Sequence, residues 1–528
     1  MRYFGFVVLL LILVGCLPFK DNNESSRFFY NLEAARGEYV AARLGNTNVT
    51  PSESLRISVN GVEAELVSFN KQVAVFEVPQ AVDGLTQSEG QVPVVISDGS
   101  NRVEGRLRIL GDTEPGTFVA LDVSGDFDGR LSTALQNLQE RENGLFDNLR
   151  VVQEPSPEQF QQFRSTDIAS RRQLPQLPDA PSPFPVDGER IPLINPRTDT
   201  DFDLQIDENI SLLKDTNSPC TADLVTFTVA GVPLAELLEE LEEVGLPGDG
   251  NSVGMGDQEQ SEPSRELDVS QQDLPFTGRG ATVAVLDSEI ETDPDVIPSF
   301  QGNVLGNLGI DFVNEGGNSS HGTLVARAAS VSAPDAQFMS VKVCHVNPVD
   351  EGTGVDCRAD RVARGICHAL VHAPDGPSNL VLNLSFGGPQ DLSVHRLLLE
   401  HAADELDVSV AASAGNESSL GSPTHYPAAY SAKGNGIMAV AAYNEQDDEP
   451  FREGTEGPFI DITALGESTS YSSPRVAGAM AVLKEAGGLS SAEIKSCLIN
   501  GVDESISGTS DQIGAGLLSI SGALSACF

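Results

Sequence analysis

The pattern of apolar and polar positions changes character three times along the chain. Residues 41–111 alternate apolar with polar side chains in short runs between turn residues, which predicts an antiparallel β-sandwich. Residues 117–246 hold two strand–helix pairs around a long stretch rich in Pro, Gln and Asp, so we expect an α+β region with an irregular insert. Residues 247–274 carry almost no apolar side chains and are expected to be a linker. In residues 275–528 continuously apolar strands alternate with helical runs, which is typical of an α/β domain with a parallel sheet.

The β-rich module has short strands separated by turn pairs such as Asn60-Gly61 and Asp98-Gly99. In this respect it resembles the small immunoglobulin-like modules of bacterial surface proteins, which serve as spacers or binding platforms. No chemistry is therefore assigned to it.

The first residues have the layout of an export signal. Arg2 precedes an apolar run that is too short to cross a bilayer and that ends at Gly15-Cys16. A cysteine after a small residue at this point resembles the bacterial lipobox, which implies removal of residues 1–15 and acylation of Cys16. The protein is then expected to be an extracytoplasmic lipoprotein anchored in a membrane of a bacterial cell envelope. A plain signal peptide with an incidental cysteine is the alternative.

The charge balance limits the choice of partner. Among 528 residues, 32 Lys and Arg face 77 Asp and Glu, which gives a formal net charge of −45. No basic stripe is present, so nucleic acid is excluded as a partner. Such a surface is strongly solvated and favours cationic partners.

Cysteine usage points to disulfide bonds. An even number of cysteines follows Cys16, and in an exported protein an even number favours disulfides whose connectivity the sequence leaves open. The local pairings are Cys344 with Cys357 or with Cys367, and Cys497 with Cys527. Zinc bound by the Cys and His residues of 344–372 is the alternative, but their spacing matches no standard finger. The six cysteines are Cys220, Cys344, Cys357, Cys367, Cys497 and Cys527.

One stretch has the features of a nucleophile site. Ser470 lies just before Pro474, which suits a first helical turn, and a run of small and apolar residues follows at 476–483. Ser470 is therefore expected at the positive end of a buried helix, where a developing negative charge is stabilised. On this stretch alone, a hydroxyl-rich turn capping an ordinary core helix is the alternative.

Four further segments carry candidate chemistry. Asp287 ends an apolar strand, and buried parallel strands deliver functional residues at their carboxyl ends. His321 opens a helix of small residues, another strand runs into Gly387-Gly388, and a third leads to Asn416.

In the chain order Asp287, His321, Asn416 and Ser470, these segments resemble the subtilisin family of serine proteases. The order Asp, His, Ser separates that family from the α/β-hydrolases and from chymotrypsin-like proteases. The resemblance runs from about residue 276 to the C-terminus. It implies a subtilisin-like parallel-sheet catalytic domain, preceded here by the β-sandwich module and the α+β region.

The resemblance also implies a role for each residue. Ser470 would attack the scissile carbonyl, and His321 would take and return the proton. Asp287 would orient the imidazole, and Asn416 would donate to the oxyanion. No metal or organic cofactor is needed, and although family members often carry structural calcium, no such site is assigned here. The edge that would pair with an extended peptide is Ser385, Phe386, Gly387 and Gly388.

Three residues depart from the family pattern. Glu289 lies two residues after Asp287, where the family usually has glycine. Ser468 lies two residues before the nucleophile, where glycine is again usual, and Arg475 follows Pro474, where histidine is usual. The leading interpretation is a lipid-anchored serine endopeptidase that acts on proteins or peptides. A catalytically degenerate surface binding or adhesion protein is the alternative, and an esterase is disfavoured because Gly-x-Ser-x-Gly is missing at Ser470.

The α+β region 117–246 precedes the catalytic domain as an intramolecular chaperone or inhibitor does in the subtilisin family. The linker would then be a processing site, and a cut there would separate the protease from Cys16 unless the two parts remain associated. A second spacer domain is the alternative. Glu417, beside Asn416, is expected to favour basic or polar side chains in the specificity pocket.

Overall fold

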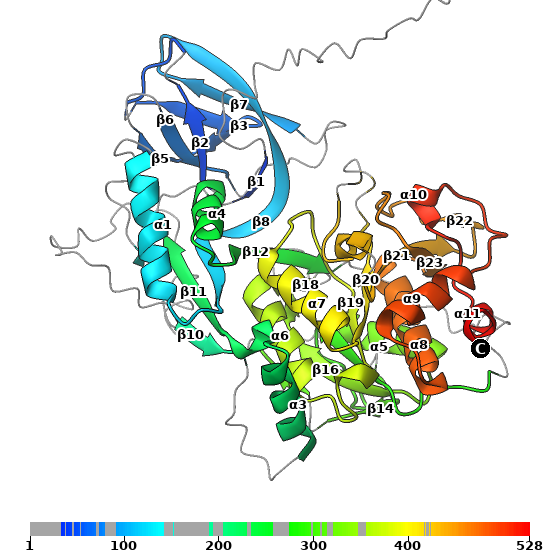
Figure 1. Cartoon of the computed structure of the whole chain (residues 1–528). Coiled ribbons are helices and arrows are strands. Elements are labelled where there is room, and N and C mark those ends of the chain that lie inside the picture. The colour runs from blue at the N-terminus through cyan, green and yellow to red at the C-terminus, as the bar shows by residue number, and fades with distance from the viewer. Residues whose placement is uncertain are drawn as a thin grey trace, which may run out of the picture.

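A computed structural model gives the architecture of the protein (Figure 1). The residues that it describes are 33–36, 39–44, 47–52, 54–69, 73–79, 91–141, 151–152, 189–193, 204–229, 234–256, 274–296, 299–306, 309–313, 320–346, 355–416, 418, 422, 424–433 and 435–528. Cys16 with the predicted signal peptide, and Glu417, lie outside these residues.

The N-terminal β-region consists of two sheets that share one apolar core. In one sheet the order is β2-β6-β5, and in the other β4, β3, β7 and β8 are antiparallel neighbours while β1 pairs parallel to β8. Ala42 and Phe76 of the first sheet and Ile57 and Ile96 of the second are buried in that core. The alternation of apolar and polar positions thus yields two packed sheets, and the immunoglobulin-like assignment stays a prediction. The strands are β1 (Glu33–Arg36), β2 (Tyr39–Arg43), β3 (Arg56–Val59), β4 (Val62–Ala64), β5 (Leu66–Phe69), β6 (Val73–Glu77), β7 (Gln91–Ser97) and β8 (Arg102–Asp122).

Strand β8 joins this region to the next one. Its first residues pair with β7, and its last residues, from Thr117 to Asp122, pair with β11. Pro115 and Gly116 would ordinarily interrupt a strand, and the pairing of β12 with β8 shifts register here, between Thr113 and Phe118. One strand therefore spans the boundary that the sequence pattern places between residues 111 and 117 (Figure 1).

The α+β region packs two helices, α1 and α4, on β8, β11 and β12. Phe118, Phe227 and Phe127 form the centre of this core, with ring centroids 5.4 and 5.3 Å apart in the two contacts to Phe227. The elements are α1 (Phe127–Arg141), β9 (Val151–Val152), β10 (Glu189–Pro192), α3 (Leu204–Asp215), the 3₁₀ turn η3 (Pro219–Thr221), β11 (Asp223–Val229), α4 (Leu234–Glu243) and β12 (Gly248–Gly256).

Strand β12 lies in the segment expected to be a linker. Its first half pairs with β8, and residues 253–256 pair antiparallel with β18 of the following domain. Backbone hydrogen bonds hold a strand that has almost no apolar side chains, so composition gave no signal for it. The remainder of the predicted linker, 257–273, lies outside the described residues.

The C-terminal domain is built on a mainly parallel sheet in the order β14-β16-β13-β19-β20-β21-β22. Helices α5 and α8 contribute to the core on one face of this sheet, and α6 and α7 to the core on the other. Close packing of α8 on α5 requires Gly478, because a Cβ added there would lie 2.4 Å from the carbonyl oxygen of Ala329. The strands are β13 (Thr282–Asp287), β14 (Asn303–Val304), β15 (Ile310–Asp311), β16 (Gln337–Lys342), β17 (Cys344–Val346), β18 (Val355–Arg358), β19 (Leu380–Leu384), β20 (Ser409–Ser413), β21 (Ile437–Asn444), β22 (Glu449–Pro450) and β23 (Ile462–Leu465). The helices are α5 (His321–Ser332), α6 (Ala359–Val371), η5 (Pro377–Asn379), α7 (Ser393–Glu405), η7 (Ala428–Lys433), α8 (Thr469–Ala486), α9 (Ser491–Asn500), α10 (Ser510–Ile513) and α11 (Ile520–Cys527).

Three disulfides join the six cysteines. Cys344–Cys357 and Cys497–Cys527 confirm two of the local pairings. Cys367 bonds to Cys220 rather than to Cys344, across 147 residues of sequence. The described helices include none that is both long and apolar enough to cross a membrane.

Candidate active site

Asp287 and His321 meet at the carboxyl end of β13. The imidazole Nδ1 lies 2.8 and 2.9 Å from the two carboxylate oxygens of Asp287, and both side chains are buried. The Asp287 carboxylate also accepts from the Ser288 N–H at 2.6 Å, which fixes its orientation. Because the carboxylate accepts the Nδ1 proton, a neutral imidazole here carries its lone pair on Nε2.

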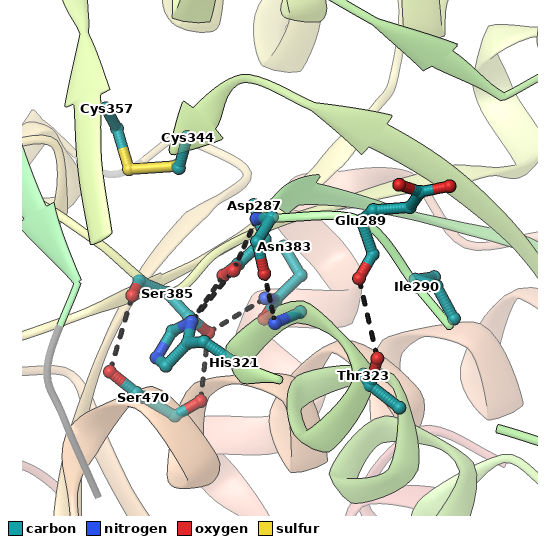
Figure 2. A network of polar contacts seen from close by, with 12 residues as sticks. Asp287, Glu289, Ile290, His321, Thr323, Cys344, Cys357, Asn383, Ser385 and Ser470 are labelled. Carbon is teal, nitrogen blue, oxygen red and sulfur yellow. Dashed lines mark hydrogen bonds and ion pairs between the residues drawn. A yellow bond between two sulfur atoms is a disulfide. The ribbon is translucent and has the colours of Figure 1, made fainter. Parts of the chain in front are cut away.

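Ser470 lies in the first turn of α8, at the positive end of the helix as predicted, but the helix already begins at Thr469, so Pro474 lies inside it and not in its first turn. Figure 2 shows the imidazole of His321 between the Asp287 carboxylate and Ser470. The Ser470 hydroxyl donates to the carbonyl oxygen of Ser385 at 3.3 Å, and the Ser385 hydroxyl donates to the carbonyl oxygen of Ser470 at 2.9 Å. These two hydrogen bonds join the start of α8 to the residue that follows β19.

Asn383 supports this junction and was not predicted from the sequence. Its side-chain amide donates to the Ser385 hydroxyl at 2.9 Å and accepts from the Ser473 hydroxyl at 3.2 Å. A fully buried polar residue within an otherwise apolar strand was the available signal, since buried amides require partners.

The side chain of Asn416 has a fixed orientation. Its Oδ1 accepts from the backbone N–H of Thr469 at 3.2 Å and from the Thr469 hydroxyl at 2.9 Å. A backbone N–H can only donate, so this face of the amide must be the oxygen. The Nδ2 group is buried and makes no hydrogen bond within the described part of the chain. It is a donor available beside the start of α8.

The predicted substrate edge, 385–388, is partly occupied. Gly388 exchanges both backbone hydrogen bonds with Tyr426, at 2.9 and 2.7 Å, and the side chain of Phe386 is buried. Gly387 packs so closely that an added Cβ would lie 2.3 Å from both His425 Nε2 and the Tyr426 carbonyl oxygen. The close approach of His425, which sequence reasoning missed, explains why glycine is needed at this position.

Glu289 turns away from the imidazole (Figure 2). Its half-exposed carboxylate lies 3.9 Å from the ammonium of Lys342, which is buried and pairs with Asp311 at 2.9 Å. These three side chains line a cavity of about 590 Å³ on the side of β15 and β16. The carboxylate of Glu289 therefore lines this cavity and does not face the imidazole of His321.

The other two departures also fit the fold. Ser468, directly before α8, has an extended backbone (φ −157°, ψ 166°) that any residue adopts, so glycine is not required there. Arg475 is buried within α8.

The zinc alternative is wrong, because Cys344, Cys357 and Cys367 are all consumed in disulfides and provide no thiolate. Within the described ranges, no group of three or more His, Cys, Asp or Glu side chains is arranged to hold a metal ion.

Comparisons with known proteins point to one family. Residues 278–516 match the Subtilase family. The intracellular serine protease of Paenibacillus polymyxa is 27% identical over 242 residues, which cover 39% of this chain and 68% of that protein. Subtilisin BL of Lederbergia lenta is 30% identical over 232 residues, covering 40% of this chain and 78% of that protein. Subtilisin J of Geobacillus stearothermophilus is 30% identical over 240 residues, which cover 39% of this chain and 56% of that protein.

Solved structures are more distant. Fervidolysin from Fervidobacterium pennivorans, a keratinolytic enzyme related to subtilisin, aligns with a TM-score of 0.43 at 17% identity, over 61% of this chain and 59% of its own. At that similarity it adds nothing to the sequence matches, which span between about half and four-fifths of the relatives' lengths.

Proposed function

The chain belongs to the subtilase family, and from this premise we propose that it is an extracytoplasmic serine endopeptidase anchored to a bacterial membrane through acylated Cys16. Its substrates are proteins or peptides, and no nucleic acid takes part. The observation that carries the catalytic proposal is the buried Asp287–His321 pair, with Nδ1 2.8 Å from the carboxylate, next to Ser470 in the first turn of α8.

In the proposed reaction the Ser470 oxygen attacks the carbonyl carbon of the scissile peptide bond while His321 Nε2 takes the hydroxyl proton. The C–N bond then breaks, and His321 gives that proton to the leaving amine. Water repeats the sequence on the acyl-enzyme and releases the acid product. Asp287 keeps the proton on Nδ1 and stabilises the imidazolium that forms.

The negative charge of the tetrahedral intermediate requires donors. Asn416 Nδ2 is held in place by the two contacts of Asn416 Oδ1 with Thr469, which supports its role beside the Ser470 backbone N–H. The extended substrate would pair with the backbone of Ser385, Phe386 and Gly387, whereas Gly388 already pairs with Tyr426. This chemistry uses no metal or organic cofactor.

The N-terminal regions have proposed roles as well. The β-region is taken as an immunoglobulin-like spacer that holds the protease away from the membrane, and residues 117–246 as a propeptide-like domain. Anchoring is tested by growing cells on a labelled fatty acid. Label is expected on the wild-type protein and not on Cys16→Ser, and label on both would contradict the anchor.

Catalysis is tested with a fluorophosphonate probe and intact mass spectrometry. One adduct is expected on the wild type and none on Ser470→Ala, because only an activated serine reacts. If neither folded protein is modified, the catalytically degenerate binding protein becomes the leading interpretation.

A further inference from the structure

Residues 204–256 cover the two helices α6 and α7 on one face of the catalytic sheet. Leu213 and Leu224 belong to the same continuous apolar core as Ile366 of α6 and Leu398 of α7. All four side chains are almost fully buried. The contact between the two parts of the chain is therefore a shared core and not an exposed surface.

A polar contact closes the C-terminal end of α6. The buried amide of Asn209 donates to the carbonyl oxygens of Val371 at 2.9 Å and Ala373 at 3.0 Å. The last carbonyls of a helix have no partner within the helix, and a buried one is costly without a donor. Asn209 supplies that donor from the preceding region.

A charged contact closes the N-terminal end of α7. The buried carboxylate of Asp249 accepts from the backbone N–H groups of Ser393 at 2.8 Å and Val394 at 2.7 Å. The Ser393 hydroxyl adds a third hydrogen bond at 3.1 Å. An aspartate at this position satisfies orphan donors and complements the positive end of the helix.

A covalent bond crosses the same interface. Cys220, in η3, is bonded to Cys367 of α6, and both residues are fully buried. The two cysteines lie on opposite sides of 257–273 in the sequence. Residues 253–256 of β12 add a backbone ladder to β18.

We infer that residues 204–256 are a permanent, disulfide-held part of the catalytic unit, so that a chain cut within 257–273 yields two pieces that stay joined. The binding surface is the α6–α7 face, and its partner is this chain's own preceding region. In combination with the proposed function, on which this consequence rests, a protease processed at 257–273 would remain attached to its membrane anchor.

The first experiment tests the covalent link in the full-length Ser470→Ala protein, with a site for a sequence-specific protease inserted between residues 257 and 273. After cutting, a non-reducing denaturing gel is expected to show one species at the size of the uncut chain, and reduction is expected to give two. Removing the bond with Cys220→Ser and Cys367→Ser should give two species without reductant. The matched control, Cys497→Ser with Cys527→Ser, should still give one.

Two species from the cut parent protein without reductant would overturn the inference. Peptide mapping of the uncut protein tests the same bond independently of the cut: the linked Cys220–Cys367 peptide is expected, and free thiols at both positions would overturn the inference as well. Because Ser470 is already replaced, failure of the protease proposal leaves these outcomes unchanged.

The second experiment tests the surface without the tether. The cut Cys220→Ser, Cys367→Ser protein is expected to elute as one complex under native conditions. Asn209→Ala or Asp249→Ala should weaken it by about tenfold in Kd, the effect of losing one buried cap. Two outcomes would show that the α6–α7 face is not the docking surface. One is immediate separation of the two pieces of the cut Cys220→Ser, Cys367→Ser protein, and the other is an unchanged Kd in both the Asn209→Ala and the Asp249→Ala variant.

Discussion

Two helix N-termini of this protein are used in opposite ways. At α7 the positive end is filled by the Asp249 carboxylate, which comes from the preceding region. At α8, where Ser470 lies, Ser468 makes no side-chain capping hydrogen bond among the described residues, and Asn416 Oδ1 accepts from the N–H of Thr469 alone. The carboxylate at α7 stabilises an interface, whereas at α8 the amide that accepts from Thr469 leaves the Ser470 N–H as the proposed donor for a charge that appears only during a reaction.

The comparison predicts two separate sets of consequences. Substitutions around α8 should change catalytic rates with little effect on folding. Substitutions at the α6–α7 interface should change stability and leave the rate of the folded enzyme intact.

The largest effect is expected at Asp287. Asp287→Asn cannot hold the proton on Nδ1 of His321 in the same way, so kcat should fall roughly 10⁴-fold while the protein stays folded. The measurement is kcat on a peptide substrate together with the thermal midpoint. Asp311→Asn, whose side chain pairs with Lys342, is the matched control and should keep most of the activity. An equal loss in both variants would show that the fall in kcat is not specific to the contact between Asp287 and His321.

A smaller loss is expected at Asn416. Asn416→Leu removes the Nδ2 donor at similar size, and kcat should fall by about 10²–10³, the magnitude found for the corresponding donor in subtilisin. KM should change little, because the donor acts on charge that develops after binding. Asn444→Leu, at the end of β21, is the control. A change confined to KM would show that Asn416 acts in substrate binding.

Stability rather than rate should respond at Asp249. Asp249→Ala removes the cap of α7 and should lower the free energy of unfolding by about 1–2 kcal/mol, with kcat unchanged at temperatures where the protein is folded. Asp98→Ala removes a comparable turn contact in the N-terminal β-region, where the carboxylate accepts from three backbone N–H groups. The Asp98 variant should leave the cut complex intact. A large fall in kcat for Asp249→Ala would show that the α6–α7 interface also affects catalysis, and not stability alone.

The pH dependence of stability should carry a signature of the same residue. Burial raises the pKa of the Asp249 carboxyl from 3.8 to about 6. The folded state therefore binds this proton more readily than the unfolded chain, so the contribution of Asp249 to stability increases as pH falls through 6 and is complete below about 4. The difference in urea midpoint between wild type and Asp249→Asn should follow that trend. A difference independent of pH would contradict the raised pKa.

The smallest effect is expected at Glu289. Glu289→Gln removes a half-exposed charge 3.9 Å from Lys342, which keeps its closer pair with Asp311. Water screens the half-exposed carboxylate, and contacts screened in this way contribute about 0–1 kcal/mol, so kcat/KM and the thermal midpoint should both stay close to wild type. A marked shift in the pH profile of kcat/KM would instead connect this acid to His321.

The sequence predicted the parts of the fold that depend on side-chain pattern. Continuous apolar runs gave the parallel strands, whereas Pro474 indicated the helix but not its first turn, since α8 begins at Thr469 and contains Pro474 in its interior. Local cysteine pairs could be chosen, but the bond between Cys220 and Cys367 depends on how α6 meets the preceding region. Strand β12 escaped prediction because its position is fixed by backbone pairing with two strands far away in the sequence.

The site was predictable to a similar degree. Asp287, His321 and Ser470 were singled out by residue type and order, and the structure brings Asp287 against His321 and Ser470 into the first turn of α8. Asn383 and His425 were missed because their contacts, with Ser385 and Gly387, exist only once separate strands and loops are packed together.

Strand β8 has a mechanical consequence. Its 21 residues, at about 3.3 Å each, give a contour length of roughly 70 Å. One continuous sheet runs from β4, β3 and β7 of the N-terminal β-region through β8 to β12 and β18 (Figure 1). A pull on the N-terminal β-region is therefore transmitted along one hydrogen-bonded strand instead of being absorbed at a loose joint. The orientation of the catalytic domain relative to the N-terminal β-region is therefore set by the curvature of a single strand.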